Sequence, residues 1–510
     1  MSNSEKRGKK AITVAIYMLL VTWILLLLLL IAVYALRLQG YNSFYEWKNR
    51  NQTETVRPLV VTPAPVAVAG TDKAEGTENI PVTQRPEQTG MAEESFDSGE
   101  SREPENVSEK TPEKTPEKEN VPEQVTALAL TGQETIDEEI RYQAAKFFGE
   151  EAPVCYISYE TGIYFSVVFQ QGEKLLPLVY NRETQQQMTG SKMMKETYFA
   201  IIKERLQTEV RQRFPEEAGS SFVTYEELYQ VEDYEQFYMT EDSLVFYFDE
   251  NTLTENSHAP FCYEVELSEA EAFFYNKLDG SPNGHAIREL DPEAKMIALT
   301  FDDGPYSKIE EKLIPLLESY DAKATFFFLG HRAEEWYPEM PGKLYAAGHE
   351  VASHTYSHEL NFDVVSAEEL WTEVNRTNLV LAKACGYAPE YIRFPGGSAG
   401  KTGKVPMLVV NWDMDSVDYA DKNTENGDRI IFERLLNSSY FDDGSIVLLH
   451  SIYENSYGAV ELLLPYLKEQ GYELVTLSEL FYYKCRDKEL EPGVVYFDGQ
   501  GNTKRVKRQE

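Results

Sequence analysis

Positive charge is scarce in this sequence of 510 residues. Lysine and arginine together number 48 against 85 aspartates and glutamates, and the formal net charge is −37 at pH 7. Such a chain has no electrostatic attraction for a phosphate backbone or for an anionic lipid surface. The composition therefore excludes nucleic acid as a partner and favours a neutral or partly cationic polymer.

Cysteine is rare as well. The four copies are Cys155, Cys262, Cys385 and Cys485, and they form no C-x-x-C pair and no zinc-knuckle spacing. In an oxidising compartment Cys155 could pair with Cys262, and Cys385 with Cys485. Isolated buried thiols are equally consistent with these positions, so the sequence favours neither arrangement.

Long hydrophobic runs are absent except at residues 11–36, where 26 residues carry no charge. As a helix this run would be about 39 Å long, enough to cross a hydrocarbon core of roughly 30 Å. The apolar region of a cleaved signal peptide is shorter, about 7–15 residues. Four basic residues lie in residues 1–10, which predicts a cytosolic N-terminus. We therefore expect a single-pass membrane protein with the rest of the chain outside the cell.

Residues 37–126 are rich in proline, glutamate, threonine and serine, as in the segment at residues 110–117. Such a composition cannot bury enough apolar area to offset the entropy lost on ordering. We predict a disordered linker that spaces the anchor from folded domains. A passive tail whose length does not matter is the alternative interpretation.

Residues 127–276 have the composition of a small folded domain. Helical periodicity alternates there with runs rich in β-branched and aromatic residues, and about 150 residues suffice to bury a core. We predict an α+β accessory domain that carries no catalytic motif. The predicted helices are residues 134–148 and 197–214, and the predicted strands lie in residues 154–169, 243–248 and 261–267.

Residues 287–486 alternate between strand-like and helix-like patterns. Repeated strand–helix units predict parallel strands flanked by helices, the α/β class, with functional side chains at the carboxyl ends of the strands. After this domain, residues 487–510 are predicted to be a disordered tail. The predicted strands are residues 296–301, 324–329, 350–353, 391–394, 408–412, 445–449 and 473–475, and the predicted helices are residues 309–320, 338–347, 367–385, 428–436 and 459–470.

The strand at residues 296–301 stops at Asp302-Asp303-Gly304-Pro305, a sequence that cannot continue a strand interior. Successive side chains of a strand point to opposite sides, so Asp302 and Asp303 can take different roles. A polar turn is the ordinary interpretation of these four residues. The histidines downstream favour a functional one.

Two of the seven histidines, His354 and His358, directly follow the strand at residues 350–353. Their i, i+4 spacing places both imidazoles on one face if the segment turns helically. With one carboxylate from Asp303 they make a two-histidine, one-carboxylate set, which zinc hydrolases and non-haem iron enzymes both use. A histidine pair alone is more often an ordinary surface or core feature, so the pairing with Asp303 carries the metal-site prediction.

Five motifs in chain order resemble those of polysaccharide deacetylases of the NodB-homology type, carbohydrate esterase family 4. The resemblance covers about 200 residues and implies an irregular (β/α) barrel with fewer units than the eight-fold form. Residues 244–253 and 259–274 also resemble, more weakly, the end of a small α+β domain in membrane-anchored peptidoglycan N-acetylglucosamine and N-acetylmuramic acid deacetylases. The five motifs are residues 300–305, 354–358, 393–397, 418–419 and 448–450.

The resemblance implies that Asp303, His354 and His358 hold a divalent metal ion. Zn²⁺ is the expected ion, and Co²⁺, Ni²⁺, Mn²⁺ or Fe²⁺ can occupy the same ligand set. A bound metal lowers the pKa of its water and polarises the acetyl carbonyl. Asp302 is then the general base that takes the proton of the attacking water.

Three more residues are implied to support the chemistry. His450 would protonate the leaving amine as the general acid. Asp418 would raise the pKa of His450, and Arg393 would hold Asp302 ionised by pairing with it. A simple ion pair at the mouth of the barrel is the alternative for Arg393 and Asp418, and Asp413 and Asp415 have a weaker claim.

The substrate is expected to contact Tyr306, Pro395, Gly396, Tyr419 and Leu448. Two of these depart from the family pattern, which usually has Trp where Tyr419 stands and commonly Tyr where Gly396 stands. Tyr419 keeps a stacking surface, and backbone N–H groups near Tyr306 or Gly396 are the expected donors to an oxyanion. The departures affect substrate fit more than chemistry.

The predicted function is metal-dependent removal of N-acetyl groups from N-acetylhexosamine residues of an extracellular glycan, with peptidoglycan as the leading substrate. An O-acetyl esterase, or a deacetylase of another N-acetylhexosamine polymer, would use the same residues. A non-catalytic glycan-binding protein and a metal-dependent oxygenase are two further candidates. The accessory domain is predicted to bind the wall or act as a spacer, and a purely structural role is its alternative.

Overall fold

A computed structural model provides the coordinates. The membrane anchor predicted at residues 11–36 and the linker predicted at residues 37–126 lie outside the residues that it describes. Within the described residues, no helix is both long enough and apolar enough to pass through a membrane. The described residues are 130–149, 155–172, 174–213, 236–248, 261–362, 364–398 and 405–505.

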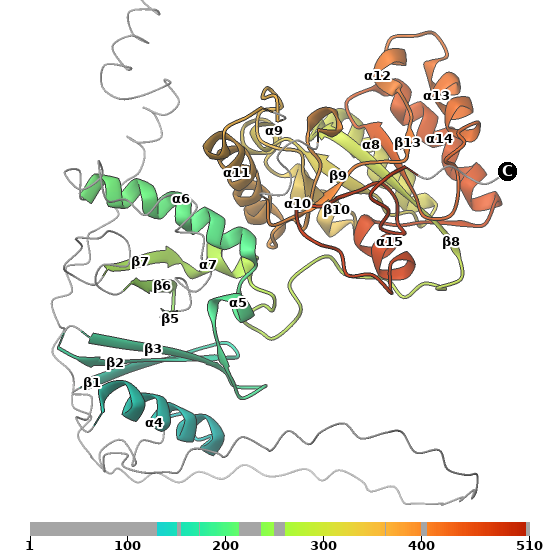
Figure 1. Cartoon of the computed structure of the whole chain (residues 1–510). Coiled ribbons are helices and arrows are strands. Elements are labelled where there is room, and N and C mark those ends of the chain that lie inside the picture. Colours follow the sequence, from blue (N-terminus) through green and yellow to red (C-terminus); the bar gives the residue numbers. More distant parts are fainter. Residues whose placement is uncertain are drawn as a thin grey trace, which may run out of the picture. The chain divides into compact units, whose positions relative to one another are not determined.

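The accessory part begins with an antiparallel sheet covered by a helix. Helix α4 (Glu134–Phe148) packs its apolar face against strands β2 (Tyr164–Gln171) and β3 (Lys174–Asn181). The sheet order is β1-β2-β3-β4, with β1 at Cys155–Thr161 and β4 at Gln186–Met188. Figure 1 shows α4 lying along this sheet. The predicted helix spans these same residues, whereas β3 and β4 were not predicted.

A second antiparallel sheet has the order β5-β6-β7 and is covered by α6 (Glu196–Arg213) (Figure 1). Aromatic and aliphatic side chains of the helix, among them Tyr198, Ile202 and Leu206, share one core with Phe246. This arrangement gives the predicted α+β class. The strands are Phe237–Met239, Ser243–Phe248 and Phe261–Glu266, and the short helices α5 (Gly190–Met193), α7 (Leu267–Ala270) and η3 (Glu271–Phe273) complete this part.

The remaining part is built on a parallel sheet of nine strands within the described residues. Its order is β13-β14-β8-β9-β10-β11-β12-β16, and β15 also pairs with β8. The strands are β8 (Lys295–Gly304), β9 (Thr325–Phe328), β10 (Glu350–Ser353), β11 (Tyr391–Ile392), β12 (Leu408–Val410), β13 (Met414–Asp415), β14 (Ser445–His450), β15 (Tyr472–Leu474) and β16 (Val495–Tyr496).

The sheet is open, which corrects the expectation of a barrel. The strands at its two ends, β13 and β16, have no pairing with each other in the part of the chain that the structure describes. The α/β class and the parallel order stand as predicted.

Both faces of β8 are buried, which explains its nearly continuous apolar sequence. Ile297, Leu299 and Phe301 pack in one core with helices α8 and α14, whereas Met296 and Ala298 pack on the other face with α15. The helices are α8 (Ser307–Ser319), α9 (Gly330–Glu335), α10 (Met340–Ala346), α11 (Ala367–Cys385), α12 (Asp418–Asp421), α13 (Gly427–Leu436), α14 (Glu454–Glu469) and α15 (Leu477–Lys484).

The prediction of a disordered tail at residues 487–510 is wrong for the residues that the structure describes, which run to 505. Strand β16 pairs in parallel with β12, and Tyr496 is buried in the same core as Met296. The neighbouring Val495 packs against a second core, which contains Ile392 and Val409, so the strand contributes to both faces of the sheet. Helices α9, α12 and α15 were also not predicted.

Cys262, Cys385 and Cys485 are free thiols in the structure, so the pairing of Cys385 with Cys485 is not formed. The two residues belong to different cores, because Cys385 packs with the α8 side of the sheet and Cys485 with the α15 side. Burial raises the pKa of the Cys385 thiol to about 12. The side chain of Cys155 lies outside the description.

Candidate metal centre and active site

The predicted site residues converge at the carboxyl edge of the parallel sheet. His450, the last residue of β14, lies opposite Asp302 of β8 in the strand register. Ser353 of β10 lies opposite Ile392 of β11, so the residues that follow them, His354 and Arg393, emerge side by side. Strand register thus gathers motifs that are up to about 150 residues apart in sequence.

Asp303, His354 and His358 form the predicted ligand set. Asp303 Oδ1 lies 3.4 Å from the Nε2 atoms of both histidines, and one ligand atom from each residue falls within 4.8 Å of the others. The three side chains were therefore correctly grouped by sequence. Burial opposes the charge on Asp303, but the rings of His354, His450 and His358 outweigh it and lower its pKa.

The hydrogen bonds around these residues fit a bound cation. His354 Nδ1 donates to the carbonyl oxygen of Arg393 at 2.7 Å, so in the neutral imidazole Nε2 carries a lone pair. That lone pair faces Asp303 Oδ1, a buried oxygen that has no hydrogen-bond partner in the described structure. Two acceptors face each other in this way when a metal ion lies between them, and the Nδ1 bond is the orienting contact typical of metal-bound histidine.

The segment between the two histidines is a bend and not a helical turn, so the helical condition for placing both imidazoles on one face is not met. Thr355 and His358 adopt φ values of 67° and 63°, which a helix does not allow. The bend is held by Glu373 on α11, whose Oε2 accepts the backbone N–H groups of Tyr356 and Ser357, each at 2.8 Å. Glu373 was not predicted, because a glutamate within a helix carries no local signal of this role.

Asp302 forms a buried ion pair with Arg393. Arg393 Nη1 donates to Asp302 Oδ1 at 2.7 Å, and the arginine is fully buried, with Phe327 stacked on its guanidinium at 4.1 Å. Its other donors bond Thr300 Oγ1 at 2.8 Å and two backbone carbonyls. Arg393 is thereby fixed, and Asp302 Oδ2 is left directed towards the ligand set, 3.8 Å from His354 Nε2.

His450 is held by Asp418. Its Nδ1 lies 2.7 Å from Asp418 Oδ1, and its backbone N–H donates to Oδ2 of the same carboxylate at 2.8 Å. Ser456 Oγ also donates to that oxygen, at 2.6 Å. Burial lowers the pKa of His450, but the hydrogen bond and charge of Asp418, with smaller contributions from Asp302 and Asp303, outweigh it and raise the pKa to about 9. The free Nε2 lies 3.9 Å from Asp303 Oδ2.

A family model described as polysaccharide deacetylase matches residues 289–405. A peptidoglycan-N-acetylglucosamine deacetylase of Bacillus cereus is 30% identical over 215 residues, which are 40% of this chain and 96% of that protein. The chain belongs to the polysaccharide deacetylase family.

Other relatives of this chain are matched over part of their length. The peptidoglycan-N-acetylmuramic acid deacetylase PdaC of Bacillus subtilis is 35% identical over 213 residues, 40% of this chain and 44% of that protein. The chain spans less than half the length of the first curated relatives that it matches. Among solved structures, PdaC has 36% identity and a TM-score of 0.36, covering 39% of this chain and 95% of that one.

The expected substrate contacts lie around the motifs. Tyr419 is 49% exposed, and its ring centroid is 6.2 Å from that of His450, so it offers a stacking surface beside His450. Pro395 and Gly396 form a tight turn after β11, where Gly396 has a φ of 65° that a tyrosine rarely adopts. Leu448 is almost entirely buried, packed on the α15 side of the sheet.

Helix α8, which follows Asp303, carries a buried carboxyl group that the sequence did not indicate. Glu310 accepts the Tyr306 backbone N–H and the Ser451 hydroxyl, each at 2.6 Å, and burial raises its pKa to about 7. The Tyr306 N–H is thus occupied, which corrects its expected role as an oxyanion donor. Gly396 remains the predicted backbone donor.

Asp413 and Asp415 have structural partners instead of His450. Asp413 Oδ1 accepts the Ile446 backbone N–H at 2.8 Å, and burial raises its pKa to about 7. Asp415 Oδ1 accepts the Val417 N–H at 2.9 Å. Asp418 is therefore the acid that orients the histidine, as the family pattern implies.

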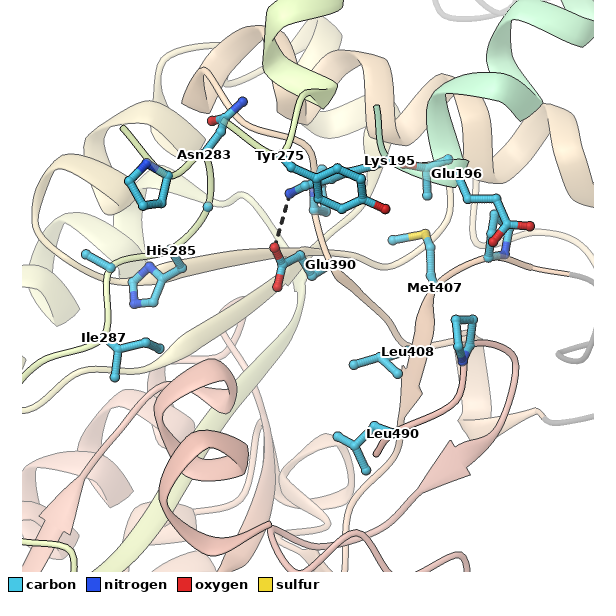
Figure 2. Close-up of a pocket in the computed structure, with 17 residues that line it drawn as sticks. Lys195, Glu196, Tyr275, Asn283, His285, Ile287, Glu390, Met407, Leu408 and Leu490 are labelled. Atoms are coloured by element: carbon cyan, nitrogen blue, oxygen red, sulfur yellow. Dashed lines mark hydrogen bonds and ion pairs between the residues drawn. The ribbon is translucent and has the colours of Figure 1, made fainter. Parts of the chain in front are cut away.

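A separate cavity lies at the amino ends of β11 and β12. Figure 2 shows Tyr275, Ile287 and Leu408 around it and an ion pair of 3.1 Å between Lys195 Nζ and Glu390 Oε1. None of the residues from the five deacetylase motifs is among those that line it. The chemistry of the family therefore belongs to the opposite edge of the sheet.

Proposed function

We propose that this protein hydrolyses the N-acetyl groups of N-acetylhexosamine residues in peptidoglycan outside the cell. The observation that carries the proposal is the arrangement of two proton-transfer groups around the Asp303, His354 and His358 ligand set. Asp302 Oδ2 lies 3.8 Å from Nε2 of the ligand His354. His450 Nε2 lies 3.9 Å from Oδ2 of the ligand Asp303. A base and an acid are thus both within reach of one amide.

A divalent metal ion held by Asp303, His354 and His358 would polarise the acetyl carbonyl and acidify a water. Asp302 takes a proton from the attacking water through Oδ2, while Arg393 occupies Oδ1 and keeps the carboxylate in place. The water oxygen bonds to the carbonyl carbon. His450 then donates the proton on Nε2 to the amide nitrogen as the C–N bond breaks, and acetate and a free amine leave.

The state of His450 favours amide hydrolysis over ester hydrolysis. An amine leaves a tetrahedral carbon poorly unless its nitrogen is protonated, whereas an alcohol needs less help. With a pKa of about 9, His450 carries the required proton at neutral pH. The retention of Asp302 and His450 also argues against a descendant that only binds glycan.

The names of relatives support peptidoglycan as the substrate, and the N-terminal sequence supports a location outside the cell. Relatives of 30–35% identity bear the names of peptidoglycan deacetylases acting on N-acetylglucosamine or on N-acetylmuramic acid. The apolar run at residues 11–36, with basic residues before it, supports a membrane anchor with the catalytic domain outside. Protease added to intact, wall-stripped cells should therefore release the catalytic domain, and complete protection would contradict this orientation.

Acetate release from purified peptidoglycan tests the activity directly. Wild-type protein should release acetate and leave free amines on the glycan, chelation should abolish the release, and re-addition of Zn²⁺ should restore it. Acid hydrolysis of the product then separates glucosamine from muramic acid units. Full activity of a demonstrably metal-free preparation would refute the mechanism, and equal release from O-acetylated, N-deacetylated glycan would favour the esterase alternative.

A further inference from the structure

Helix α9 brings a side chain that belongs to none of the five motifs to the edge of the site. The helix begins directly after β9, and its first residues bond to the metal-binding bend. Gly330 N–H donates to the Thr355 carbonyl at 3.0 Å, and His331 N–H donates to the Tyr356 carbonyl at 3.1 Å. The next residue is Arg332. Its position is therefore fixed relative to His354 and His358, which flank the same bend.

The guanidinium of Arg332 has no anionic partner among the residues that the structure describes. No carboxylate lies within 4.0 Å of it, and its buried Nε atom lacks a hydrogen-bond partner. Its guanidinium carbon lies 5.4 Å from the ring centroid of Trp336, which is 55% exposed. The charge of Arg332 acts on Glu310 and on Tyr453, opposing the rise in pKa that burial causes in both.

A second cation, Lys422, lies over the ring of Tyr453. Lys422, an exposed residue just after α12, places Nζ 5.4 Å from the Tyr453 ring centroid, and no ion pair engages it in the described part of the chain. Tyr453 itself lies 5.7 Å from the ring of His450. Lys422 thus lies against the aromatic residue beside His450, and the charge of Arg332 acts on the same residue, although the chain as a whole has a net charge of −37.

We propose that Arg332 and Lys422 form an anion subsite for a carboxylate carried by the sugar that is deacetylated, and that the preferred unit is N-acetylmuramoyl. This inference rests on the proposed function. The muramoyl residue carries a lactyl ether on C3, next to the C2 that bears the acetamido group, whereas N-acetylglucosamine has a neutral hydroxyl there. A carboxylate near the reacting amide needs local cations, because a strongly acidic protein otherwise repels it. In stem-bearing glycan the lactyl carboxyl is amide-linked, and the charge comes from stem-peptide carboxylates instead.

The test compares Arg332→Gln with wild-type protein on three substrates. They are N-acetylglucosamine oligomers, glycan strands stripped of stem peptides by an amidase, and strands that keep their stems. Arg332→Gln should lower kcat/KM on the stripped strands about tenfold, mostly through KM, because a charge-assisted hydrogen bond is lost. The value on neutral oligomers should change less than twofold. Arg332→Lys should keep most of the activity on stripped strands. Lys422→Gln, at an exposed position, should also lower kcat/KM on the stripped strands.

Arg486→Gln is the matched control. Arg486 is exposed and follows α15, whose Lys484 bonds the carbonyl of Ala294 just before β8, at the opposite edge of the sheet. Its replacement removes the same charge and should leave all three substrates unaffected. A loss confined to stem-bearing strands would assign the carboxylate to the stem. Equal losses on charged and neutral substrates, or no loss on either, would refute the subsite while leaving the deacetylase proposal intact. Absence of acetate release by wild-type protein from all three would refute both.

Discussion

Replacing Glu373 by glutamine should weaken metal binding without touching a metal ligand. The carboxylate of Glu373 accepts two backbone N–H groups of the bend between His354 and His358, each at 2.8 Å. A hydrogen bond to a charged group contributes about 1.5–3 kcal/mol, and a neutral amide oxygen retains roughly half of such a pair. The bend should therefore lose about 1.5–3 kcal/mol of its preference for the metal-competent conformation. At about 1.4 kcal/mol per factor of ten, metal affinity should fall about 10–100-fold.

Competition with a chromophoric chelator measures the affinity, and thermal unfolding of the metal-free protein measures stability separately. Glu368→Gln is the control, because Glu368 is an exposed glutamate of the same helix with no contact to the bend. It should bind metal as the wild type does. If Glu373→Gln lowered the unfolding temperature but left the metal affinity within twofold of wild type, Glu373 would support only the fold, and the assigned role would be refuted.

The other predictions concern the proton-transfer groups. Asp302→Asn should keep the metal and lose about 10²–10⁴-fold in turnover, the usual contribution of a general base, whereas Asp303→Asn should lose metal affinity as well. Metal content and acetate release distinguish the two, and turnover of Asp302→Asn above about a tenth of wild type would move the base elsewhere. His450 has a folded pKa of about 9, above its ordinary value of 6.5. The stability from its pairing with Asp418 is therefore fully present below pH 6.5 and lost as the pH rises through about 9. In metal-free protein, NMR titration should show this pKa, and Asp418→Asn should lower it, because the largest effect that opposes burial is then lost and only the smaller contributions of Asp302 and Asp303 remain; an unchanged value would contradict the role of Asp418.

The residues that perform the proposed chemistry could be predicted from the sequence, because each carries its signal locally. Asp302 and Asp303 follow an apolar run and precede a strand-breaking Gly-Pro, and His450 closes another apolar run. A short buried strand that ends in an ionisable residue places that residue at the carboxyl edge whatever the rest of the fold does. Identity and approximate position therefore follow from the chain alone.

Their conformations and supports were decided by tertiary contacts. The spacing of His354 and His358 suggested a helical turn, yet the bend needs positive φ values that Glu373 stabilises from 17 residues away. Ser451 and Glu310 are 141 positions apart, and no local pattern connects them.

The parallel sheet shows the same difference between what the sequence determines and what tertiary contacts decide. The sequence determined alternating strands and helices, and hence the parallel α/β class, because hydrophobic periodicity is a local property. Whether the sheet closes depends on where its end strands lie, and β13 and β16 do not pair with each other within the described residues. That the described residues place no hydrogen-bond partner at Arg332 Nε is likewise decided by neighbours that other parts of the chain bring there. Sequence by itself determined which groups are available for chemistry, and tertiary structure alone decided which atoms they face, because those distances depend on residues far away in the chain.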